Sequence, residues 1–258
     1  MIRDKPDMFP SAVAASPIEE MTLSESIMVM CANKNFMILT MAYAFIYGIY
    51  CAVGSTISNL LNPFGYSPTE ISIAGGSCML SGVIGALLVA IFVDHTAWYR
   101  KTHLSLSFLI LCSVITIYVV LHWAQGELSP VIASCVMFGV SGVSYFPISL
   151  SYGAELTFPL QPALVNACMN FFGQVCAFFM IGVSALVTDV NIEEMDSMDN
   201  NTEERQNSSY FVTIIFCFFS LITLVLAYFI KEDLRRVNFK LEEHYGNYAD
   251  ETLPLGSR

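Results

Sequence analysis

Two stripes of polar side chains occur within otherwise apolar segments, and their residue types suit the binding of a small cation. One stripe lies on a single helical face and consists of Tyr43, Tyr47 and Tyr50. The other repeats every fourth residue and consists of Asn166, Asn170 and Gln174. Aromatic ring faces attract a cation, and amide oxygens orient it. Together the two stripes predict a pocket for a small organic cation.

A structural explanation competes with this one for both stripes. Tyrosines in membrane proteins often serve as packing residues or as interface anchors. Asn and Gln side chains in membrane helices frequently only bridge one helix to another. The residue types alone leave both interpretations open.

The elements that must position these side chains are transmembrane helices. The 258 residues are 55% hydrophobic and 13% charged, with a mean hydropathy of +0.60, which is far from the composition of a soluble domain. Six apolar stretches are each long enough to cross a bilayer as a helix, which takes about 20 residues. Their ranges are 36–57, 72–93, 104–123, 131–152, 163–188 and 210–230. The sequence therefore predicts an all-α, polytopic membrane protein with six spans.

Positive charges divide the predicted chain into a bundle with two cytosolic ends. We expect a flexible arm at 1–33, a transmembrane bundle at 34–232 and a tail at 233–258. Lys and Arg residues gather before the first span, between the second and third, and after the sixth, whereas the alternate loops contain only Arg205. Since cytoplasmic flanks retain cations, both termini are predicted to be cytosolic.

The loop before the sixth span is predicted to lie outside the cytosol. It carries two sequons for N-glycosylation, which begin at Asn200 and Asn207. It also contributes to the net charge of −11, which argues against nucleic acid as a partner. An acidic vestibule that gathers cations and a merely solvated loop both fit this composition.

The predicted turn between the second and third spans concentrates charge in Asp94, Arg100 and Lys101. The helix before Asp94 has small residues at every fourth position, namely Ser77, Ser81 and Gly85. Small side chains at this spacing let a neighbouring helix approach closely. Asp94 could then pair with Arg100 or Lys101 and latch this side of the bundle in one conformation. A simple pair of charges at the membrane boundary is the alternative.

Sequence signals for catalysis, metals or cofactors are lacking. The chain has no HExxH or Gly-x-Ser-x-Gly motif, and its eight cysteines form no CxxC pair. No His is predicted at mid-membrane, where an axial haem ligand would be needed. We therefore expect no catalytic residues, no metal site and no cofactor, and we do not expect an enzyme.

Three motifs carry a resemblance to a transporter family. The sequence "VDHTAWYRKTHL" resembles the second-half copy of the loop motif of the major facilitator superfamily. Together with "GAELTFP" at 153–159 and "IKEDLRRVNFK" at 230–240, it resembles solute carrier family 49, the feline leukaemia virus subgroup C receptor-related transporters. The likeness covers about residues 33 to 240 and follows the last six of that family's twelve spans in order.

The resemblance implies roles for several residues. Glu155 and Pro159 stand where relatives carry an acidic residue and a proline after the fourth of these helices. Substrate contacts of relatives lie on helices that match the first and fifth spans, and the implied substrates are haem, choline or a related organic solute. Independently, Pro147 removes a backbone donor within the fourth span, so we expect that span to bend or loosen.

Two functions fit these observations. The first is transport of a small organic solute by alternating access, with this chain supplying the carboxy-terminal half. Because that mechanism rocks two six-helix bundles against each other, the chain needs an amino-terminal half or self-association in addition to membrane lipid. The second is a non-transporting receptor or regulatory half that pairs with a full-length relative. We expect a multi-pass protein of the plasma membrane, with an organelle membrane as the alternative.

Overall fold

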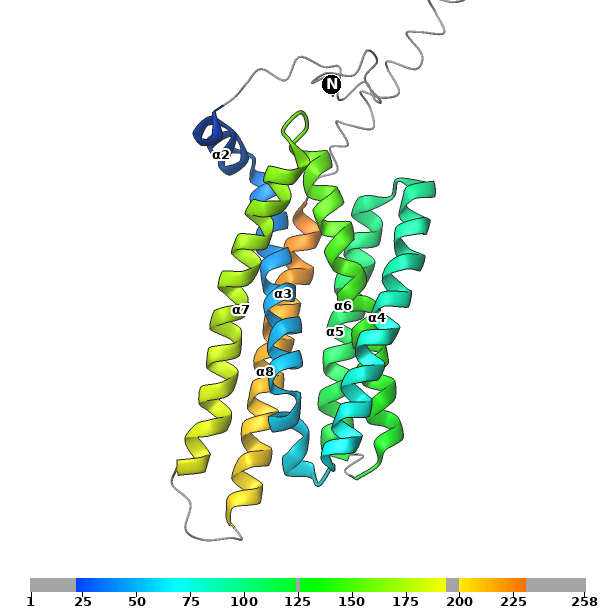
Figure 1. Ribbon diagram of the computed structural model, residues 1–258, viewed down its shortest axis with the longest axis vertical. Helices are drawn as coiled ribbons and strands as arrows, with labels where there is room; N and C mark the ends of the chain where they lie inside the picture. Colours follow the sequence, from blue (N-terminus) through cyan, green and yellow to red (C-terminus); the bar gives the residue numbers. More distant parts are fainter. Residues whose placement is uncertain (1–21, 124–125, 194–199, 231–258) are drawn as a thin grey trace, which may run out of the picture.

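The chain folds into a bundle of long, nearly antiparallel helices (Figure 1). The computed structural model describes residues 22–123, 126–193 and 200–230. Six helices in this part are long and apolar enough to cross a membrane. They are α3 (Lys34–Leu61), α4 (Pro68–Thr96), α5 (Tyr99–Trp123), α6 (Leu128–Leu156), α7 (Pro162–Glu193) and α8 (Asn200–Phe229). The all-α, six-span prediction is confirmed, and each predicted span lies within one helix except for the last residue of the sixth.

Short connections reverse the chain between the first three long helices. After α3, a 3₁₀ turn (Asn62–Phe64) leads to Gly65, whose φ of 86° lies in the left-handed region that favours glycine. Ser67 then caps α4 through a reciprocal capping box with Glu70. We call the end of the bundle with this connection the α3–α4 end, and the opposite end, where Ala97 terminates α4, the α4–α5 end.

Two helices form the centre of the bundle. In α3 and α6, 56% of the most apolar stretch is buried, against 22% in α4, 28% in α7, 33% in α8 and 39% in α5. Helix α6 packs against α4 and α5, while α3 packs against α7 and α8. The bundle is therefore two groups of helices, joined through the contact of α5 with α8 and through the central pair α3 and α6.

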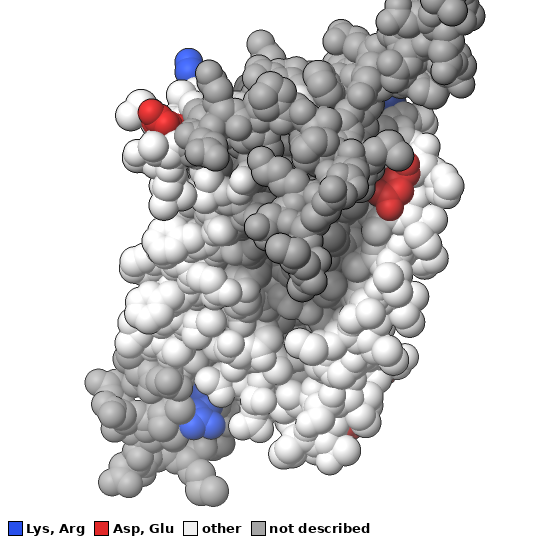
Figure 2. Space-filling model, turned by 45° about the horizontal axis from the view of Figure 1, so that its top comes forward, with Lys and Arg blue, Asp and Glu red and all other residues white. Residues whose placement is uncertain are grey.

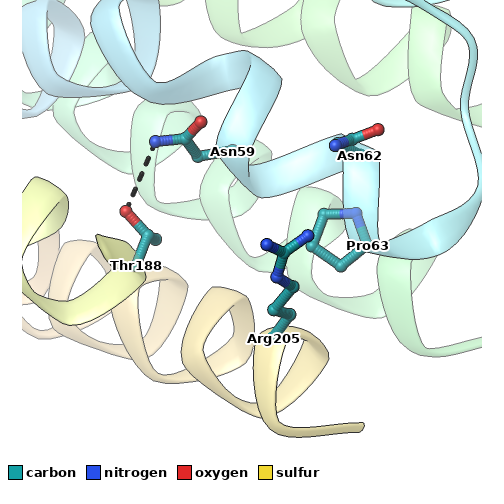
Figure 3. Close-up of a pocket in the computed structure, with 5 residues that line it drawn as sticks. All are labelled: Asn59, Asn62, Pro63, Thr188 and Arg205. Carbon is teal, nitrogen blue, oxygen red and sulfur yellow. Dashed lines mark hydrogen bonds between the residues drawn. The ribbon is translucent and has the colours of Figure 1, made fainter. Parts of the chain in front are cut away.

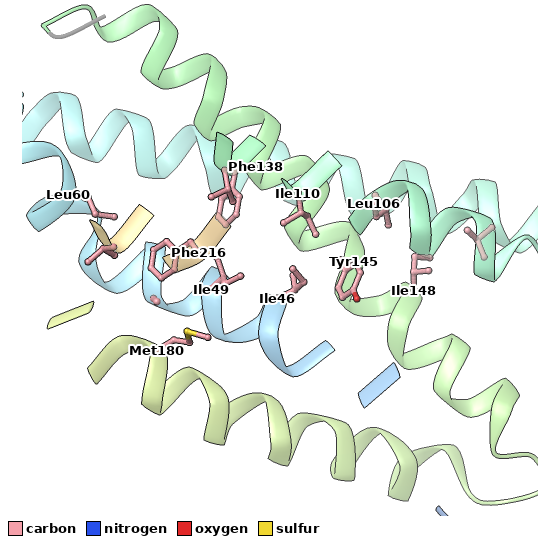
Figure 4. Packing of buried hydrophobic residues seen from close by; sticks show 14 residues of the cluster. Ile46, Ile49, Leu60, Leu106, Ile110, Phe138, Tyr145, Ile148, Met180 and Phe216 are labelled. Atoms are coloured by element: carbon pink, nitrogen blue, oxygen red, sulfur yellow. The ribbon is translucent and has the colours of Figure 1, made fainter. Parts of the chain in front are cut away.

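The main apolar core fills the space between α3, α5, α6 and α8 (Figure 4). Ile46 and Ile49 of α3 point into it together with Phe138 and Tyr145 of α6, and Phe216 of α8 closes it. All five side chains are at most 2% exposed. This core fixes α3 and α6, which carry most of the aromatic residues discussed below.

Helices α4 and α6 come unusually close to each other. A Cβ atom at Gly85 would lie 2.9 Å from Val140 Cγ1 and 3.1 Å from Val140 Cα, so only glycine fits there without a shift. Ser81 Oγ donates a hydrogen bond to the carbonyl oxygen of Val136 at 3.2 Å across the contact. The small-residue face predicted for α4 therefore does meet a neighbouring helix, although Ser77 bonds only within α4, to the carbonyl of Ala74.

Two segments differ from their predicted form. The described end of the predicted flexible arm folds into helix α2 (Leu23–Ala32), because Thr22 and Glu25 form a capping box and Met30 is fully buried. The predicted loop at 189–209 is shorter than expected, since α7 runs to Glu193 and α8 begins at Asn200. Residues 1–21, 194–199 and 231–258 of the predicted arm, loop and tail lie outside the described residues.

The surface has the charge distribution of a membrane protein. In Figure 2 the coloured charged residues lie towards the two ends of the bundle, and the long sides between them are white. Large apolar side chains such as Leu87, Leu88 and Phe178 are more than 60% exposed on these sides. Six apolar helices with such a surface indicate a multi-pass membrane protein.

Candidate functional site

The tyrosine stripe of α3 gathers around one phenylalanine of α6. The ring centroids of Tyr43, Tyr47 and Tyr50 lie 6.0, 5.4 and 5.3 Å from that of Phe146. Tyr43 and Tyr47 also stack on each other at 5.7 Å. The i, i+4 and i+7 spacing on α3 thus produces a continuous aromatic surface, with Phe146 as its common neighbour.

The amide stripe of α7 meets this aromatic surface. The Tyr43 hydroxyl donates to Asn170 Oδ1 at 2.7 Å, and Gln174 Nε2 donates to the Tyr47 hydroxyl at 2.6 Å. Asn170 Nδ2 in turn donates to the backbone carbonyl of Asn166 at 2.9 Å. The structure therefore brings together the two stripes that the sequence placed on separate helices.

The site opens towards one side of the bundle. Tyr43 is 1% exposed, Tyr47 is half-buried and Gln174 is exposed. The two hydrogen-bonded pairs therefore differ in exposure to the outside of the bundle. Tyr43–Asn170 is the inner pair, and Tyr47–Gln174 is the pair at the surface. Tyr47 lies near the middle of α3 (Lys34–Leu61), so this surface is at about half the height of the helix. We call Tyr43, Tyr47, Phe146, Asn170 and Gln174 the aromatic–amide site.

Two glycines allow α3 and α7 to approach closely enough for these contacts. A Cβ atom at Gly173 would lie 3.0 Å from Tyr43 Cε1 and 3.2 Å from Tyr47 Cδ1. One at Gly48 would lie 3.1 Å from both Cys176 Sγ and Met180 Cγ. Gly173 thus faces two side chains of α3 and leaves room for their rings, whereas Gly48 faces side chains of α7 and also the backbone carbonyl carbon of Cys176 at 3.3 Å.

Asn166 has a polar atom that nothing in the described part of the chain satisfies. Its Oδ1 is buried and has no hydrogen-bond partner among those residues. It lies one helical turn from Asn170, on the same face of α7. A buried acceptor without a donor is unfavourable by about 1–3 kcal/mol. Asn166 Oδ1 can therefore accept a hydrogen bond from a ligand, or from a protein donor that a different arrangement of α7 would bring close.

This arrangement is suited to an organic cation. The rings of Tyr43, Tyr47 and Phe146 supply π faces, and Tyr and amide groups supply oxygen atoms, but the aromatic–amide site contains no ionised side chain. A weakly hydrated cation can lie against rings at low desolvation cost, whereas a small metal ion prefers charged oxygen ligands. No cluster of metal-ligand side chains occurs in the described ranges of the chain.

The predicted latch residues lie at the α4–α5 end and contact other groups. Arg100 Nη2 donates to the carbonyl oxygen of Tyr228 at 3.3 Å, at the end of α8. Lys101 Nζ lies 4.4 Å from the centre of the Trp98 ring. Asp94 is exposed, and no ion pair joins it to either cation within the part of the chain that the structure describes. A latch formed in another conformation stays a prediction.

The other predicted structural residues lie in and after α6. Pro147 is inside α6, which continues through it from Leu128 to Leu156. Glu155 is 5% exposed near the end of that helix, and Pro159 follows in the connection to α7 through a cis peptide bond with Phe158. Of the two sequons, Asn207 is exposed on α8, and Asn200 begins that helix.

A small pocket at the α3–α4 end was not predicted (Figure 3). It has a volume of about 120 Å³ and lies between the ends of α3, α7 and α8. Asn59 Nδ2 donates to Thr188 Oγ1 at 3.4 Å on one side, and the Arg205 side chain points towards Pro63 on the other. Its residues are Asn59, Asn62, Pro63, Thr188 and Arg205.

Two further residues escaped sequence reasoning for different reasons. Phe146 follows no polar pattern, and only the packing of α6 against α3 shows that it joins the tyrosines. His103 lies just outside the predicted third span at 104–123, yet it is 1% exposed and its ring lies 4.6 Å from that of Tyr145. Because α5 begins at Tyr99, His103 lies within the helix, and the Ser107 hydroxyl donates to its carbonyl oxygen at 2.8 Å.

Comparisons with known proteins agree with the resemblance found in the sequence. No model of a protein family matches the chain. Over 263 residues, it is 23% identical to the choline/ethanolamine transporter FLVCR1 of Mus musculus, an alignment that covers 99% of this chain and 43% of the relative. It is 26% identical over 270 residues to the choline/ethanolamine transporter flvcr2a of Danio rerio, covering 99% of this chain and 53% of the relative.

A relative with a different name gives the family designation. Solute carrier family 49 member A3 of Danio rerio is 21% identical over 180 residues, which are 69% of this chain and 38% of the relative. The chain spans about half the length of the curated relatives it matches. These homologues confirm the resemblance to solute carrier family 49, and their names are those of transporters rather than enzymes.

Proposed function

We propose that this chain supplies the carboxy-terminal half of a transporter that moves a choline-like organic cation by alternating access. The observation that carries the proposal is the aromatic–amide site, in which Tyr43 and Tyr47 are held by Asn170 and Gln174 near the middle of α3. Relatives named as choline/ethanolamine transporters support the same class of substrate. Plasma membrane is the proposed location, with both termini cytosolic and Asn200 and Asn207 as glycosylation sites on the opposite side.

The chemistry of the site favours a quaternary or primary ammonium group over haem. Ring faces at Tyr47 and Phe146 attract a positive charge, and each such contact contributes about 0.5–2 kcal/mol. A haem would need an axial ligand such as histidine, and His103 is buried away from the site against Tyr145. We therefore favour choline and ethanolamine as substrates.

The exposed side of the site supports the need for a second half. Gln174 is exposed and Tyr47 half-buried on a bundle of six spans. A cation bound there would contact this chain on one side only, and alternating access requires a second bundle on the other. An amino-terminal six-span half is the proposed partner, with a second copy of this chain as the other candidate.

The test is uptake of labelled choline by cells that produce the chain, alone and together with a six-span amino-terminal half. Surface abundance is measured in parallel, so that a failure of targeting is separated from a failure of transport. Saturable uptake in either setting supports transport. Absence of uptake in both, with the protein at the surface and bound to a full-length relative, would support the regulatory alternative instead.

Matched variants of Tyr47 assign the uptake to the aromatic–amide site. Tyr47→Leu removes the ring and should raise KM about tenfold, whereas Tyr47→Phe keeps the π face and should change KM about threefold at most. Tyr118→Phe is the control, because Tyr118 stacks on His122 far from the site, with ring centroids 6.4 Å apart. Equal effects of Leu and Phe at position 47 would contradict a cation–π contact.

Variants of Asn170 test the inner half of the same site. Asn170→Ala leaves the buried Tyr43 hydroxyl without its acceptor, which costs about 1–3 kcal/mol and should lower the affinity for choline. Asn170→Gln keeps an amide acceptor and should retain part of the uptake. Uptake unchanged in Asn170→Ala at normal surface abundance would exclude this pair from the substrate path.

A further inference from the structure

We propose that the α4–α5 end of the bundle holds one anionic phospholipid, with its phosphate at Arg100 and Lys101 and its acyl chains in two apolar grooves beside α5. The proposal concerns a face of the molecule remote from the aromatic–amide site, and it does not depend on the transported solute.

The outward face of α5 begins with the two cations and continues with apolar residues. Arg100 lies one turn before Leu104, and Lys101 lies one turn before Ser105. Phe108 follows on the same side and is 55% exposed. This face therefore places positive charge at the membrane boundary and an apolar surface directly beside it. A phospholipid has a matching arrangement, with a charged headgroup next to apolar acyl chains.

A groove runs along each side of this face. The groove between α5 and α8 has a volume of about 910 Å³, and its lining includes the apolar residues Leu104, Phe108, Leu224 and Phe229. The groove between α4 and α5 has a volume of about 530 Å³ and is lined by Phe92 and Trp98. Ser105 lines both grooves, so its small side chain separates two places for acyl chains.

Each groove has a cation at its mouth. Arg100 reaches across to the end of α8, where its Nη2 donates to the carbonyl oxygen of Tyr228 at 3.3 Å, and Tyr228 itself lines the larger groove. Lys101 lines the smaller groove, and its Nζ lies 4.4 Å from the centre of the Trp98 ring. These contacts hold both positive charges beside the grooves.

Charge complementarity identifies the occupant as anionic. Neither cation is paired with a carboxylate in the ranges that the structure describes, where Asp94 is exposed. Each Lys or Arg at such a surface contributes about fivefold to the binding of an acidic lipid. A phosphodiester with a net negative headgroup, as in phosphatidylserine, satisfies both cations while its chains fill the grooves.

The two tryptophans of the chain provide a direct measurement. Trp98 lines the smaller groove, and Trp123 lies at the opposite end of α5, where it is 82% exposed. Trp123→Phe therefore leaves Trp98 as the single tryptophan. The purified full chain is placed in phosphatidylcholine nanodiscs that contain brominated phosphatidylserine or brominated phosphatidylcholine, with bromine near the headgroup end of the acyl chain. Quenching of Trp98 then reports which lipid occupies the groove.

The expected result is a preference for phosphatidylserine of at least about fivefold. The preference should disappear in R100Q/K101Q and persist in R100K/K101R, which retains both charges. K34Q is the matched control, because Lys34 is also an exposed cation at this end of the bundle but lines neither groove. Ser105→Phe should weaken quenching by both lipids, since its ring fills the position that the grooves share.

Three outcomes would overturn the proposal. Equal quenching by both lipids would mean that Trp98 contacts only bulk bilayer. A preference that survives R100Q/K101Q would place the anionic lipid elsewhere. A preference for phosphatidylserine that emerges only after E232Q/D233N would mean that these two carboxylates, which follow α8 in the sequence, pair with Arg100 and Lys101 in place of a lipid. The comparison of the two brominated lipids is made on the chain that keeps Arg100 and Lys101, so a poorly folded R100Q/K101Q variant does not remove the test.

Discussion

Two pairs of helices in this bundle are brought together by glycine, and they differ in what the glycine faces. Between α4 and α6, a Cβ atom at Gly139 would overlap the backbone carbonyl of Cys78. Between α3 and α7, a Cβ atom at Gly173 would meet the rings of Tyr43 and Tyr47 at 3.0–3.2 Å. Backbone cannot move without moving a helix, whereas a ring can rotate or shift. The first contact is therefore a fixed joint, and the second is adjustable.

The polar contacts follow the same division. Across the α4–α6 contact, the one hydrogen bond of Ser81 that leaves its own helix ends on backbone, at the carbonyl of Val136. Across the α3–α7 contact, side chains bond to side chains, as in Tyr43–Asn170 and Tyr47–Gln174. Such pairs can exchange a protein partner for a ligand without unfolding either helix. The proposed solute site, which must bind and release its ligand, is thus on the adjustable pair.

The largest expected effect is at the fixed joint. Gly139→Ala should lower the free energy of unfolding by about 3 kcal/mol, because the new methyl group can be accommodated only by separating α4 from α6. The midpoint of thermal unfolding in nanodiscs measures this loss. Gly76→Ala on α4 is the matched control, since nothing lies within 4 Å of its Cβ position and the change should alter stability by about 1 kcal/mol at most.

Similar stability of Gly139→Ala and Gly76→Ala would contradict the distinction between the two contacts. It would mean that α4 moves relative to α6 as easily as a tyrosine ring moves beside α7. The fixed joint would then be a candidate for the moving part of the proposed transporter.

A smaller effect on stability is expected at the adjustable contact. Gly173→Ala should lower the free energy of unfolding by about 1 kcal/mol, because the rings of Tyr43 and Tyr47 can yield by a few tenths of an ångström. It should nevertheless weaken choline binding severalfold, since the displaced rings belong to the proposed site. Gly182→Ala on the same helix is the control, with nothing within 4 Å of its Cβ position. Equal choline binding by both variants would separate α7 from the substrate site.

The spacing of residues predicted both helix faces but not their partners. Hydropathy located the six spans because membrane helices must be continuously apolar over their length. The i, i+4 rule placed the tyrosines on one face and the amides on another. That these faces meet depends on Gly48 and Gly173, and on the packing of α3 against α7, which is a property of the tertiary fold. The two stripes were predicted to form one pocket, but which tyrosine meets which amide was shown only by the structure.

Side-chain partners at the α4–α5 end could not be predicted from neighbouring positions. Opposite charges at Asp94 and Arg100 suggested a pair across the turn, yet Arg100 reaches a carbonyl 128 residues away in the sequence, at Tyr228. The last carbonyls of a helix lack intrahelical donors and accept such bonds readily. By contrast, the T-x-x-E pattern at Thr22 and Glu25 is a local signal that would have predicted the start of α2.

The smallest effect separates packing from hydrogen bonding at the fixed joint. Ser81→Ala removes the donor to Val136 O and the bond to Cys78 O within α4, at 3.2 and 3.0 Å. Hydrogen bonds between membrane helices average about 0.6 kcal/mol, so the midpoint of thermal unfolding should fall only slightly. Ser72→Ala is the matched control, because its hydroxyl bonds only within α4, to the carbonyl of Pro68. A loss at Ser81 as large as that of Gly139→Ala would show that the bond, rather than the close approach of two backbones, joins α4 to α6.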